Sequence, residues 1–177
     1  MYKIDRFTVE HWMQEVFKLN QEYYDLIRAG IKQRLNPPAK ESEIAAFEKW
    51  LGQQLPPSYR IFLSLHNGWQ HWEGDTHLIS IEQHQRGKYA EWIEKLKKEA
   101  WEEGNSAAID GIFIGVQLDS VGGYILDTSK VDDKGEMEII NLEYSEVARY
   151  SDFIDLLQQT AEDLKGLIED EKESKEK

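Results

Sequence analysis

The turn Leu55-Pro56-Pro57 constrains this chain more than any other feature, because it separates two short helical segments. Before the turn, residues 41–54 show helical apolar spacing. After it, Pro57 suits the first turn of a helix, where its missing amide is not needed. Inward-facing residues of this second helix are expected to be Tyr59, Phe62, Leu63 and His66. The pair Asn67-Gly68 predicts the helix end, since glycine tolerates a left-handed conformation.

A long amphipathic segment precedes these two helices. Residues 8–35 repeat apolar side chains at three- and four-residue steps, which predicts a helix with one apolar stripe. The stripe consists of Val9, Trp12, Met13, Val16, Leu19, Tyr23, Leu26 and Ile27. Thr8 is the expected N-cap, because its hydroxyl can accept a hydrogen bond from a first-turn amide. Asn36-Pro37-Pro38 is expected to stop the helix, because proline lacks an amide donor.

The remainder of the chain predicts strands with further helices. Strands are expected at 77–81, 112–117, 123–127 and 136–142. Residues 132–136 read as the hairpin connection between the last two strands. Helical spacing returns at 86–103 and from about residue 151 onward. The final residues are expected to form a solvated helical tail with the ion pairs Glu171–Lys175 and Glu173–Lys177.

This order of elements predicts an α+β fold, with a single antiparallel-rich mixed sheet covered by helices. The length of 177 residues fits one domain with some extra chain. We expect an N-terminal helical extension at 1–36, an α+β domain at 37–168 and a charged C-terminal tail at 169–177. The sequence leaves open whether the N-terminal helix packs on the domain or on a partner chain, and it does not fix the oligomeric state.

Composition excludes several classes of protein. The absence of cysteine excludes disulfide scaffolds, thiol catalysis and cysteine-ligated zinc. No apolar run approaches the roughly 18 residues that span a bilayer, and residues 1–12 lack a signal-peptide core, so a cytoplasmic protein is expected. The net charge is −13, and residues 41–177 hold 29 acidic side chains against 14 basic ones. Such a surface repels nucleic acids and anionic membranes and attracts basic partners.

Residues 43–69, EIAAFEKWLGQQLPPSYRIFLSLHNGW, resemble the signature of the SUKH superfamily. The signature is an Ile-x-x-Phe-Glu helix, then Leu-Gly-x-x-Leu-Pro, then a Tyr-x-x-Phe-Leu helix that ends in Asn-Gly. The matching residues are Ile44, Phe47, Glu48, Leu51, Gly52, Leu55, Pro56, Tyr59, Phe62, Leu63, Asn67 and Gly68. Weaker similarity continues at 78–81, 114–127 and 150–157. The motif is structural, and its Glu48 either ties loop amides together or lies in solvent.

The resemblance implies a function as well as a fold. The superfamily is named in part for fungal cell-wall regulators and is dominated by bacterial immunity proteins, which bind a toxin, often a nuclease, and block it. The chain departs from the pattern at Lys40 and Glu41, where family members often have Ser or Thr. The resemblance therefore implies a non-enzymatic immunity protein with a cognate protein toxin as its partner, and the acidic charge favours a basic toxin. The alternative is a regulatory scaffold of the fungal type.

A histidine-rich segment, HNGWQHWEGDTH at 66–77, offers a third hypothesis, a metal-dependent enzyme. His66 and His71 are five residues apart across the Asn67-Gly68 stop, so one helical face cannot present both to a metal. No HExxH, GxSxG or Walker A motif occurs. We therefore expect no catalytic residues, no metal and no cofactor.

The same segment is a candidate contact loop for a protein partner. Trp69 and Trp72 are the aromatic residues most expected to be exposed, with one of them packing on the sheet. Tryptophan is enriched at interface hot spots because it buries a large area with few rotamers to restrict. The full set of expected partner-binding residues is Trp69, His71, Trp72, Glu73, Asp75, Asp132, Asp133, Glu136 and Glu138. This set requires the loop and the 132–136 hairpin to lie on one side of the molecule.

Overall fold

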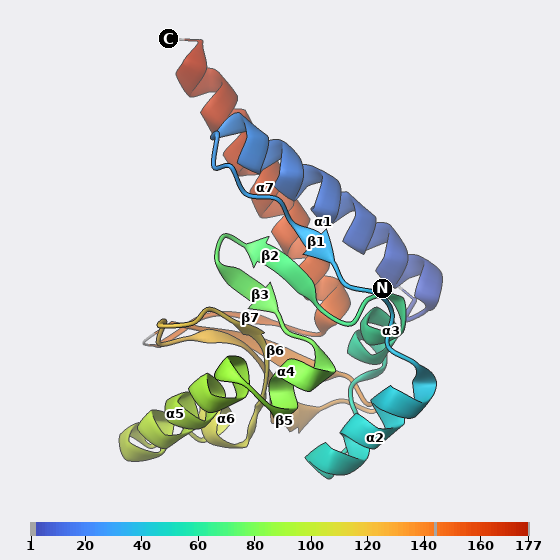
Figure 1. Cartoon of the computed structure of the whole chain (residues 1–177). Helices are drawn as coiled ribbons and strands as arrows, with labels where there is room; N and C mark the ends of the chain where they lie inside the picture. The colour runs from blue at the N-terminus through green and yellow to red at the C-terminus, as the bar shows by residue number, and fades with distance from the viewer. Residues whose placement is uncertain (1–2, 144, 177) are drawn as a thin grey trace.

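The computed structural model describes residues 3–143 and 145–176. Its helices are α1 (Arg6–Leu26), α2 (Glu41–Leu51), α3 (Pro57–Leu65), α4 (Ile81–Gln85), α5 (Lys88–Glu103), α6 (Ser106–Asp110) and α7 (Phe153–Lys175). Its strands are β1 (Arg34–Leu35), β2 (Trp69–Glu73), β3 (Thr76–Leu78), β4 (Ile112–Val116), β5 (Gly123–Val131), β6 (Met137–Glu143) and β7 (Ser145–Tyr150). Figure 1 shows α1 and α7 as a long helical pair that extends beyond the sheet. None of the described helices has a stretch long and apolar enough to cross a membrane.

The strands form one sheet in which each strand pairs with the next one in sequence, from β1 to β7. Every strand pairing among the described residues is antiparallel. The expected α+β class, with one sheet covered by helices and an N-terminal helix, is confirmed. Short connections suffice between antiparallel neighbours such as β5 and β6, whereas helices α2 and α3 join β1 to β2 and helices α4 to α6 join β3 to β4.

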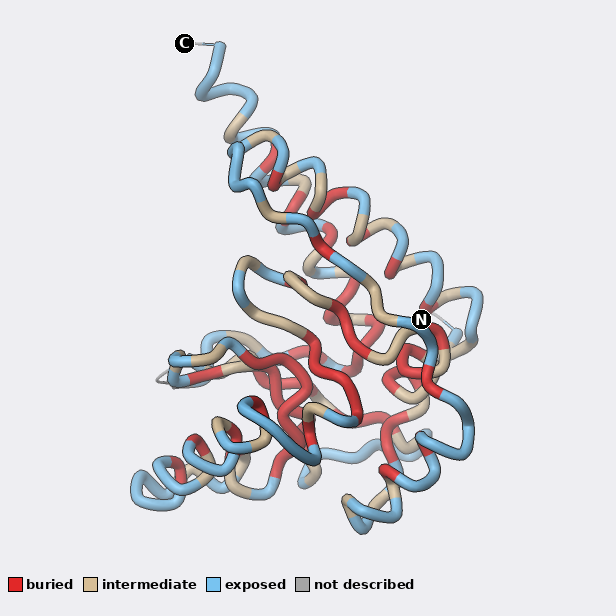
Figure 2. The backbone as a smooth tube through the Cα atoms, viewed as in Figure 1, coloured by how far each residue is buried: buried red, intermediate tan, exposed pale blue. Residues whose placement is uncertain are grey.

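Helices cover both faces of the sheet, because alternate strand residues point to opposite sides. On β4, Ile112 and Ile114 pack into a core shared with α1, α2, α3 and α7, whereas Phe113 points to the other face. There it joins Ile79 and Ile125 beneath α5 and α6. Figure 2 shows buried segments of the sheet lying between these two helical layers.

Helix α1 differs from the predicted helix at both ends. Asp5, not Thr8, is the N-cap, and its carboxylate accepts a hydrogen bond from the Thr8 amide at 2.8 Å. The helix stops at Leu26, nine residues before the predicted end, because Arg28 and Gly30 adopt left-handed conformations with φ of 55° and 68°. The prolines at 37 and 38 therefore do not end this helix. Instead, β1 adds a short strand to β2.

The apolar stripe of α1 packs on the same molecule, which answers the question that the sequence left open. Its buried residues Val9, Met13 and Val16 share a core with α3 and α7. At the far end of the helical pair, Lys172 of α7 forms an ion pair with Glu22 at 2.9 Å. Lys175 also donates a hydrogen bond to the carbonyl of Leu26 at the end of α1. The two helices therefore hold each other along their length.

The signature turn is held by one acidic side chain. Glu48 accepts hydrogen bonds from the amide of Leu55 at 3.0 Å and from Nε of Arg60 at 3.1 Å. This resolves the alternatives for Glu48 in favour of tying the turn to α3. Gly68 is required for steric reasons, since its φ is 104° and an added Cβ would lie 2.9 Å from the carbonyl oxygen of Leu78.

Several predicted boundaries are wrong by a few residues. Helix α2 ends at Leu51 rather than 54, with Gly52 as its C-cap, and α3 ends at Leu65, before Asn67-Gly68. The predicted strand at 77–81 ends at Leu78, because Ser80 caps α4. Helix α5 begins at 88 rather than 86. The strands β1, β2 and β7 and the short helices α4 and α6 were not predicted from the sequence.

The C-terminal tail continues α7 as a helix to Lys175. The expected pair Glu171–Lys175 is present at 3.4 Å. The expected pair Glu173–Lys177 lies outside the described residues, because residue 177 is not described. The expected hairpin at 132–136 connects β5 to β6, and the amide of Asp132 donates to the carbonyl of Glu136 at 2.9 Å.

Glu136, at the end of that hairpin, is buried against the first turn of α3. Its carboxylate accepts hydrogen bonds from both the amide and the hydroxyl of Ser58, each at 2.7 Å. The residue before α3 is a proline without a capping side chain, so Glu136 supplies the acceptor that the helix start lacks.

Replacing Glu136 by alanine should therefore lower the free energy of unfolding by about 2–3 kcal/mol, because Ser58 is left with unpaired buried donors. Glu136→Gln keeps one acceptor oxygen and should cost less than about 1 kcal/mol. Urea denaturation of the two variants measures the difference. An alanine variant within about 0.5 kcal/mol of the wild type would contradict this role of Glu136.

His84 of α4 is buried, and the centroid of its ring lies 4.9 Å from the centroid of the Phe47 ring. Burial, assisted by the nearby positive charge of Lys97, lowers the pKa of His84 to about 3. An unfolded histidine titrates near 6.5, so the unfolded state binds the proton first as the pH falls. The contribution of neutral His84 to stability is thus complete above about pH 6.5 and is lost progressively toward about pH 3.

When the pH is lowered from about 6.5 to about 5, before most carboxylates titrate, proton uptake by His84 in the unfolded state should reduce the free energy of unfolding by roughly 1–2 kcal/mol. His84→Phe keeps a ring against Phe47 and removes the titrating group. The free energy of unfolding of this variant should therefore fall less than that of the wild type over the same pH range. Chemical denaturation at several pH values measures both slopes, and equal slopes would contradict the prediction.

Candidate partner-binding site

The histidine-rich segment is not a loop but the β2–β3 hairpin, and a bulge in β2 determines where its tryptophans point. His71 adopts a left-handed conformation with φ of 56°, and the pairing of β2 with β3 is irregular between Trp69 and Glu73. In a regular strand, residues three apart face opposite sides; the extra residue of a bulge returns them to one side. Trp69 and Trp72 therefore both point into the core.

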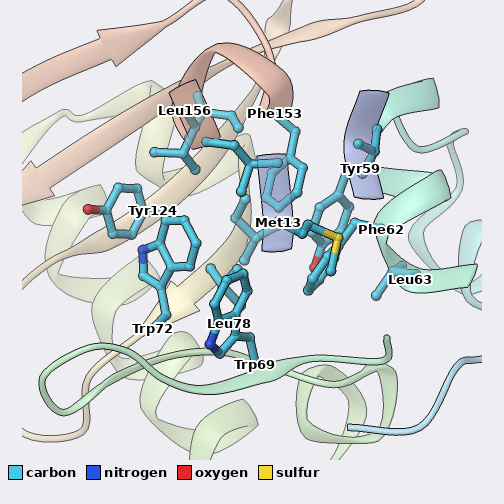
Figure 3. Close-up of a cluster of buried hydrophobic side chains, with 14 of the residues drawn as sticks. Met13, Tyr59, Phe62, Leu63, Trp69, Trp72, Leu78, Tyr124, Phe153 and Leu156 are labelled. Atoms are coloured by element: carbon cyan, nitrogen blue, oxygen red, sulfur yellow. The ribbon is translucent and has the colours of Figure 1, made fainter. Parts of the chain in front are cut away.

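This finding corrects the expected exposure of the two tryptophans. Trp69 is 0% and Trp72 is 1% exposed, and their rings pack edge to face with centroids 4.9 Å apart (Figure 3). The indole nitrogen of Trp69 donates to Gln33 at 3.1 Å. Neither ring is available on the surface as an anchor for a partner in this conformation.

Side chains of α1 hold the hairpin by its backbone. Asn20 donates to the carbonyl of Trp72 at 2.7 Å. The hydroxyl of Tyr24 donates to the carbonyl of His71 at 3.0 Å and accepts from the amide of Gly74 at 2.7 Å. Backbone groups at an irregular hairpin lack regular strand partners, so these bonds supply what the ladder does not. The hairpin is fixed in place by the N-terminal helix.

The polar residues of the hairpin have distinct environments. The amide of His71 donates to Nδ1 of His77 at 3.1 Å, and the two rings lie 4.6 Å apart. Burial lowers the pKa of His77, and the neighbouring His71 acts in the same direction. Glu73 accepts a 2.6 Å hydrogen bond from the hydroxyl of Tyr124, whereas the side chain of Asp75 is 79% exposed at the tip.

A cavity of about 420 Å³ lies between the hairpin, the sheet and the helices α1 and α7. We call it the hairpin cleft. Its walls carry aromatic and aliphatic side chains, and its polar groups include two carboxylates. The residues that define it are Asn20, Tyr23, Tyr24, Ile27, Ile31, Trp72, Glu73, Gly74, Tyr124, Asn141, Tyr150, Thr160, Asp163, Leu164 and Leu167. Its size lies within the range of small-ligand sites, which is about 300–1,000 Å³.

A second, more polar hollow of about 180 Å³ adjoins the hairpin cleft. The two share Glu73, Tyr124 and Asn141 and differ in their other walls, since the second includes Glu143. Burial raises the pKa of the Tyr124 hydroxyl, and the adjacent charge of Glu73 raises it further. Tyr124 therefore stays protonated and donates to Glu73 at the junction of the two hollows.

The other expected acidic residues do not join this site. Glu73 contacts the first part of β5 through Tyr124, whereas Asp132 and Asp133 follow its far end. Val131 lies seven residue steps along the strand from Tyr124, which is about 23 Å at about 3.3 Å per residue. The acids of the 132–136 hairpin and Glu73 therefore lie at opposite ends of β5 and do not form one cluster.

Three members of that acidic set are also engaged within the protein. Glu136 is buried against Ser58, as described above. Glu138 forms an ion pair with Arg149 at 2.6 Å, and Arg149 also pairs with Asp127 and Glu146. Asp132 accepts from the amides of Lys134 and Glu136 and so shapes its turn. Only Asp133 of this group is left as an exposed acid without such a structural contact.

The histidines do not converge as metal ligands would. The ring nitrogen Nδ1 of His66 is 2.8 Å from the carbonyl of Asn36, and His84 packs on Phe47. Nδ1 of His71 is 2.7 Å from the carbonyl of Gly74 within the hairpin. Among residues 3–143 and 145–176, no group of three or more His, Asp or Glu side chains is placed to hold a metal ion.

The sequence reasoning missed the tyrosines and Asp163 that complete the hairpin cleft. One signal was present: the stripe that α1 buries runs from Met13 and Val16 through Asn20 to Tyr24, so it includes polar groups. Polar side chains inside an apolar stripe indicate a specific hydrogen-bond partner. The partner itself, the backbone of a bulged hairpin 50 residues away, has no local signature.

Trp72→Ala should lower the free energy of unfolding by about 3–5 kcal/mol, because it removes a buried ring from the core. Asp75→Asn, at the exposed tip of the same hairpin, should change it by less than about 0.5 kcal/mol. Urea denaturation measures both. A Trp72→Ala variant as stable as the wild type would show that the ring is not part of the core.

Comparison with known proteins agrees with this architecture. The model of the SMI1/KNR4 family (SUKH-1) matches residues 38–163, which run from just before α2 into α7. A comparison with curated proteins finds no match. The family match confirms the resemblance seen in the signature turn, and α1 lies outside it. Because the match covers more than half of the sequence, the chain belongs to the SMI1/KNR4 family (SUKH-1).

Proposed function

We propose that the chain is an immunity protein, which binds a cognate bacterial toxin in the cytoplasm and blocks it without chemistry. Family membership carries this proposal, because SUKH proteins act in general by binding other proteins. The acidic surface supports it, with 29 acidic and 14 basic side chains in residues 41–177. A basic nuclease is the toxin class that this charge suits best.

The proposed contact surface is the mouth of the hairpin cleft, with His71, Glu73 and Asp75 of the β2–β3 hairpin on its rim. Glu73 and Asp75 belong to the residues expected from the sequence, and both keep exposed carboxylates. The buried Trp69 and Trp72 support this surface from beneath. A pre-organised hairpin loses little conformational entropy when a partner binds, which favours affinity.

Co-expression with the toxin domain encoded beside this gene tests the proposal. The expected result is restored growth and a complex of one toxin to one immunity protein, measured by light scattering after size exclusion. Glu102→Gln, an exposed acid on α5, is the matched control for Glu73→Gln and Asp75→Asn. Failure of the wild type to bind the adjacent gene product would favour the regulatory scaffold instead.

The association rate of that complex should fall by about tenfold or more between low salt and about 0.5 M salt, because screening removes the long-range attraction. Stopped-flow fluorescence or surface plasmon resonance measures the rate. The Glu73→Gln and Asp75→Asn double variant should show a shallower dependence on salt than Glu102→Gln. A rate that does not change with salt would contradict steering by the acidic surface.

A further inference from the structure

The walls of the hairpin cleft are unusually rich in aromatic rings that come from separate elements. Tyr23 and Tyr24 come from α1, Trp72 from β2, Tyr124 from β5 and Tyr150 from β7. The face of an aromatic ring carries partial negative charge and attracts cations. A ring-lined cavity of about 420 Å³ therefore has room and affinity for a flat or compact organic cation.

Two carboxylates add full negative charge to these rings. Glu73 is oriented by the hydroxyl of Tyr124, and Asp163 of α7 faces the same cavity without an ion pair among the described residues. No lysine or arginine lines either the hairpin cleft or the hollow beside it. Burial raises the pKa of Tyr150, and the charges of Asp163 and Glu73 raise it further, which indicates a negative potential inside the cleft.

A polar group in the wall also lacks a partner. The indole nitrogen of Trp72 is buried and makes no hydrogen bond within the described chain. In Figure 3 this nitrogen lies on the side of the ring that faces Tyr124, and both residues line the cleft. The nitrogen lies in the wall of the cleft and not on its open surface, so its N–H reports on changes in the cleft without contacting an occupant.

We propose that the hairpin cleft receives an arginine side chain from an extended segment of the protein partner; this rests on the function proposed above. The guanidinium is planar, so it can stack on the tyrosine rings while its N–H groups donate to Glu73 and Asp163. The cleft is thus a specificity pocket for one basic residue of the toxin.

Other occupants fit the cleft less well. An apolar side chain would cover Glu73 and Asp163 without pairing them, and burying an unpaired carboxylate is unfavourable. A phosphate group would be repelled by the negative charges of Glu73 and Asp163, and no lysine or arginine lines the cleft to bind it. A lysine ammonium is attracted by the same charges but is more strongly hydrated and does not stack, so arginine is preferred.

Three blocked tripeptides test this inference without the toxin: Ac-Gly-Arg-Gly-NH2 and its lysine and citrulline counterparts. Citrulline has the shape of arginine and no charge. Titration into the full-length protein is followed by the NMR signal of the Trp72 indole N–H, assigned with Trp72→Phe. We expect millimolar binding of the arginine peptide and at least tenfold weaker binding of the citrulline peptide. Equal binding of all three peptides, or no binding, would overturn the inference.

Charge-removing variants locate the binding to the cleft. Glu73→Gln combined with Asp163→Asn should weaken binding of the arginine peptide by about tenfold, whereas Glu102→Gln on α5 should leave this affinity unchanged. Thermal unfolding of each variant confirms that the domain is folded. Arginine binding that is unchanged in the double variant would place it elsewhere and overturn the inference.

The same variants separate this inference from the proposed function. If the toxin is captured equally by wild type and by the Glu73→Gln and Asp163→Asn double variant, the arginine pocket is wrong and the immunity function stands. If no adjacent toxin is captured but the arginine peptide still binds the cleft, the immunity function is wrong and the pocket stands. Scanning the toxin for an arginine whose alanine variant escapes capture identifies the residue expected to enter.

Discussion

The left-handed conformation of His71 is the local feature on which the rest of the site depends. It creates the bulge that turns both Trp69 and Trp72 toward the core, where they pack edge to face. The bulge also leaves backbone groups outside the strand ladder, and Asn20 and Tyr24 of α1 bond to them. The N-terminal helix is thereby attached to the sheet, and the space that remains between them is the hairpin cleft.

The base of the hairpin cleft is held by hydrogen bonds to the hairpin backbone and by the buried pair Trp69 and Trp72. The acidic side chains lie at the mouth of the cleft. Asp75 is exposed and Glu73 is oriented by Tyr124, so the position of the Glu73 carboxylate is set by the protein itself. Rigid placement of charge favours selective binding of a complementary cation.

The sequence predicted much of the fold, because helical periodicity and proline turns act over short distances. The signature turn was predicted from its residues, whereas the role of Glu48 was left open and its bond to Arg60 was not predicted. The site was predicted less well. A bulge at His71 has no periodic signal, so Trp69 and Trp72 were interpreted as loop residues. Contacts such as Asn20 with Trp72, 52 residues apart, follow from tertiary packing that local patterns do not contain.

The pairing of α1 with α7 has a consequence for the order in which the hairpin cleft forms during synthesis. One wall of the hairpin cleft comes from residues 20–31 and another from residues 160–167. During synthesis on the ribosome, the first wall emerges long before the second, and long-range contacts form late. The nascent chain can build its signature turn early, yet it lacks a complete cleft until Lys172 and Lys175 of α7 reach α1.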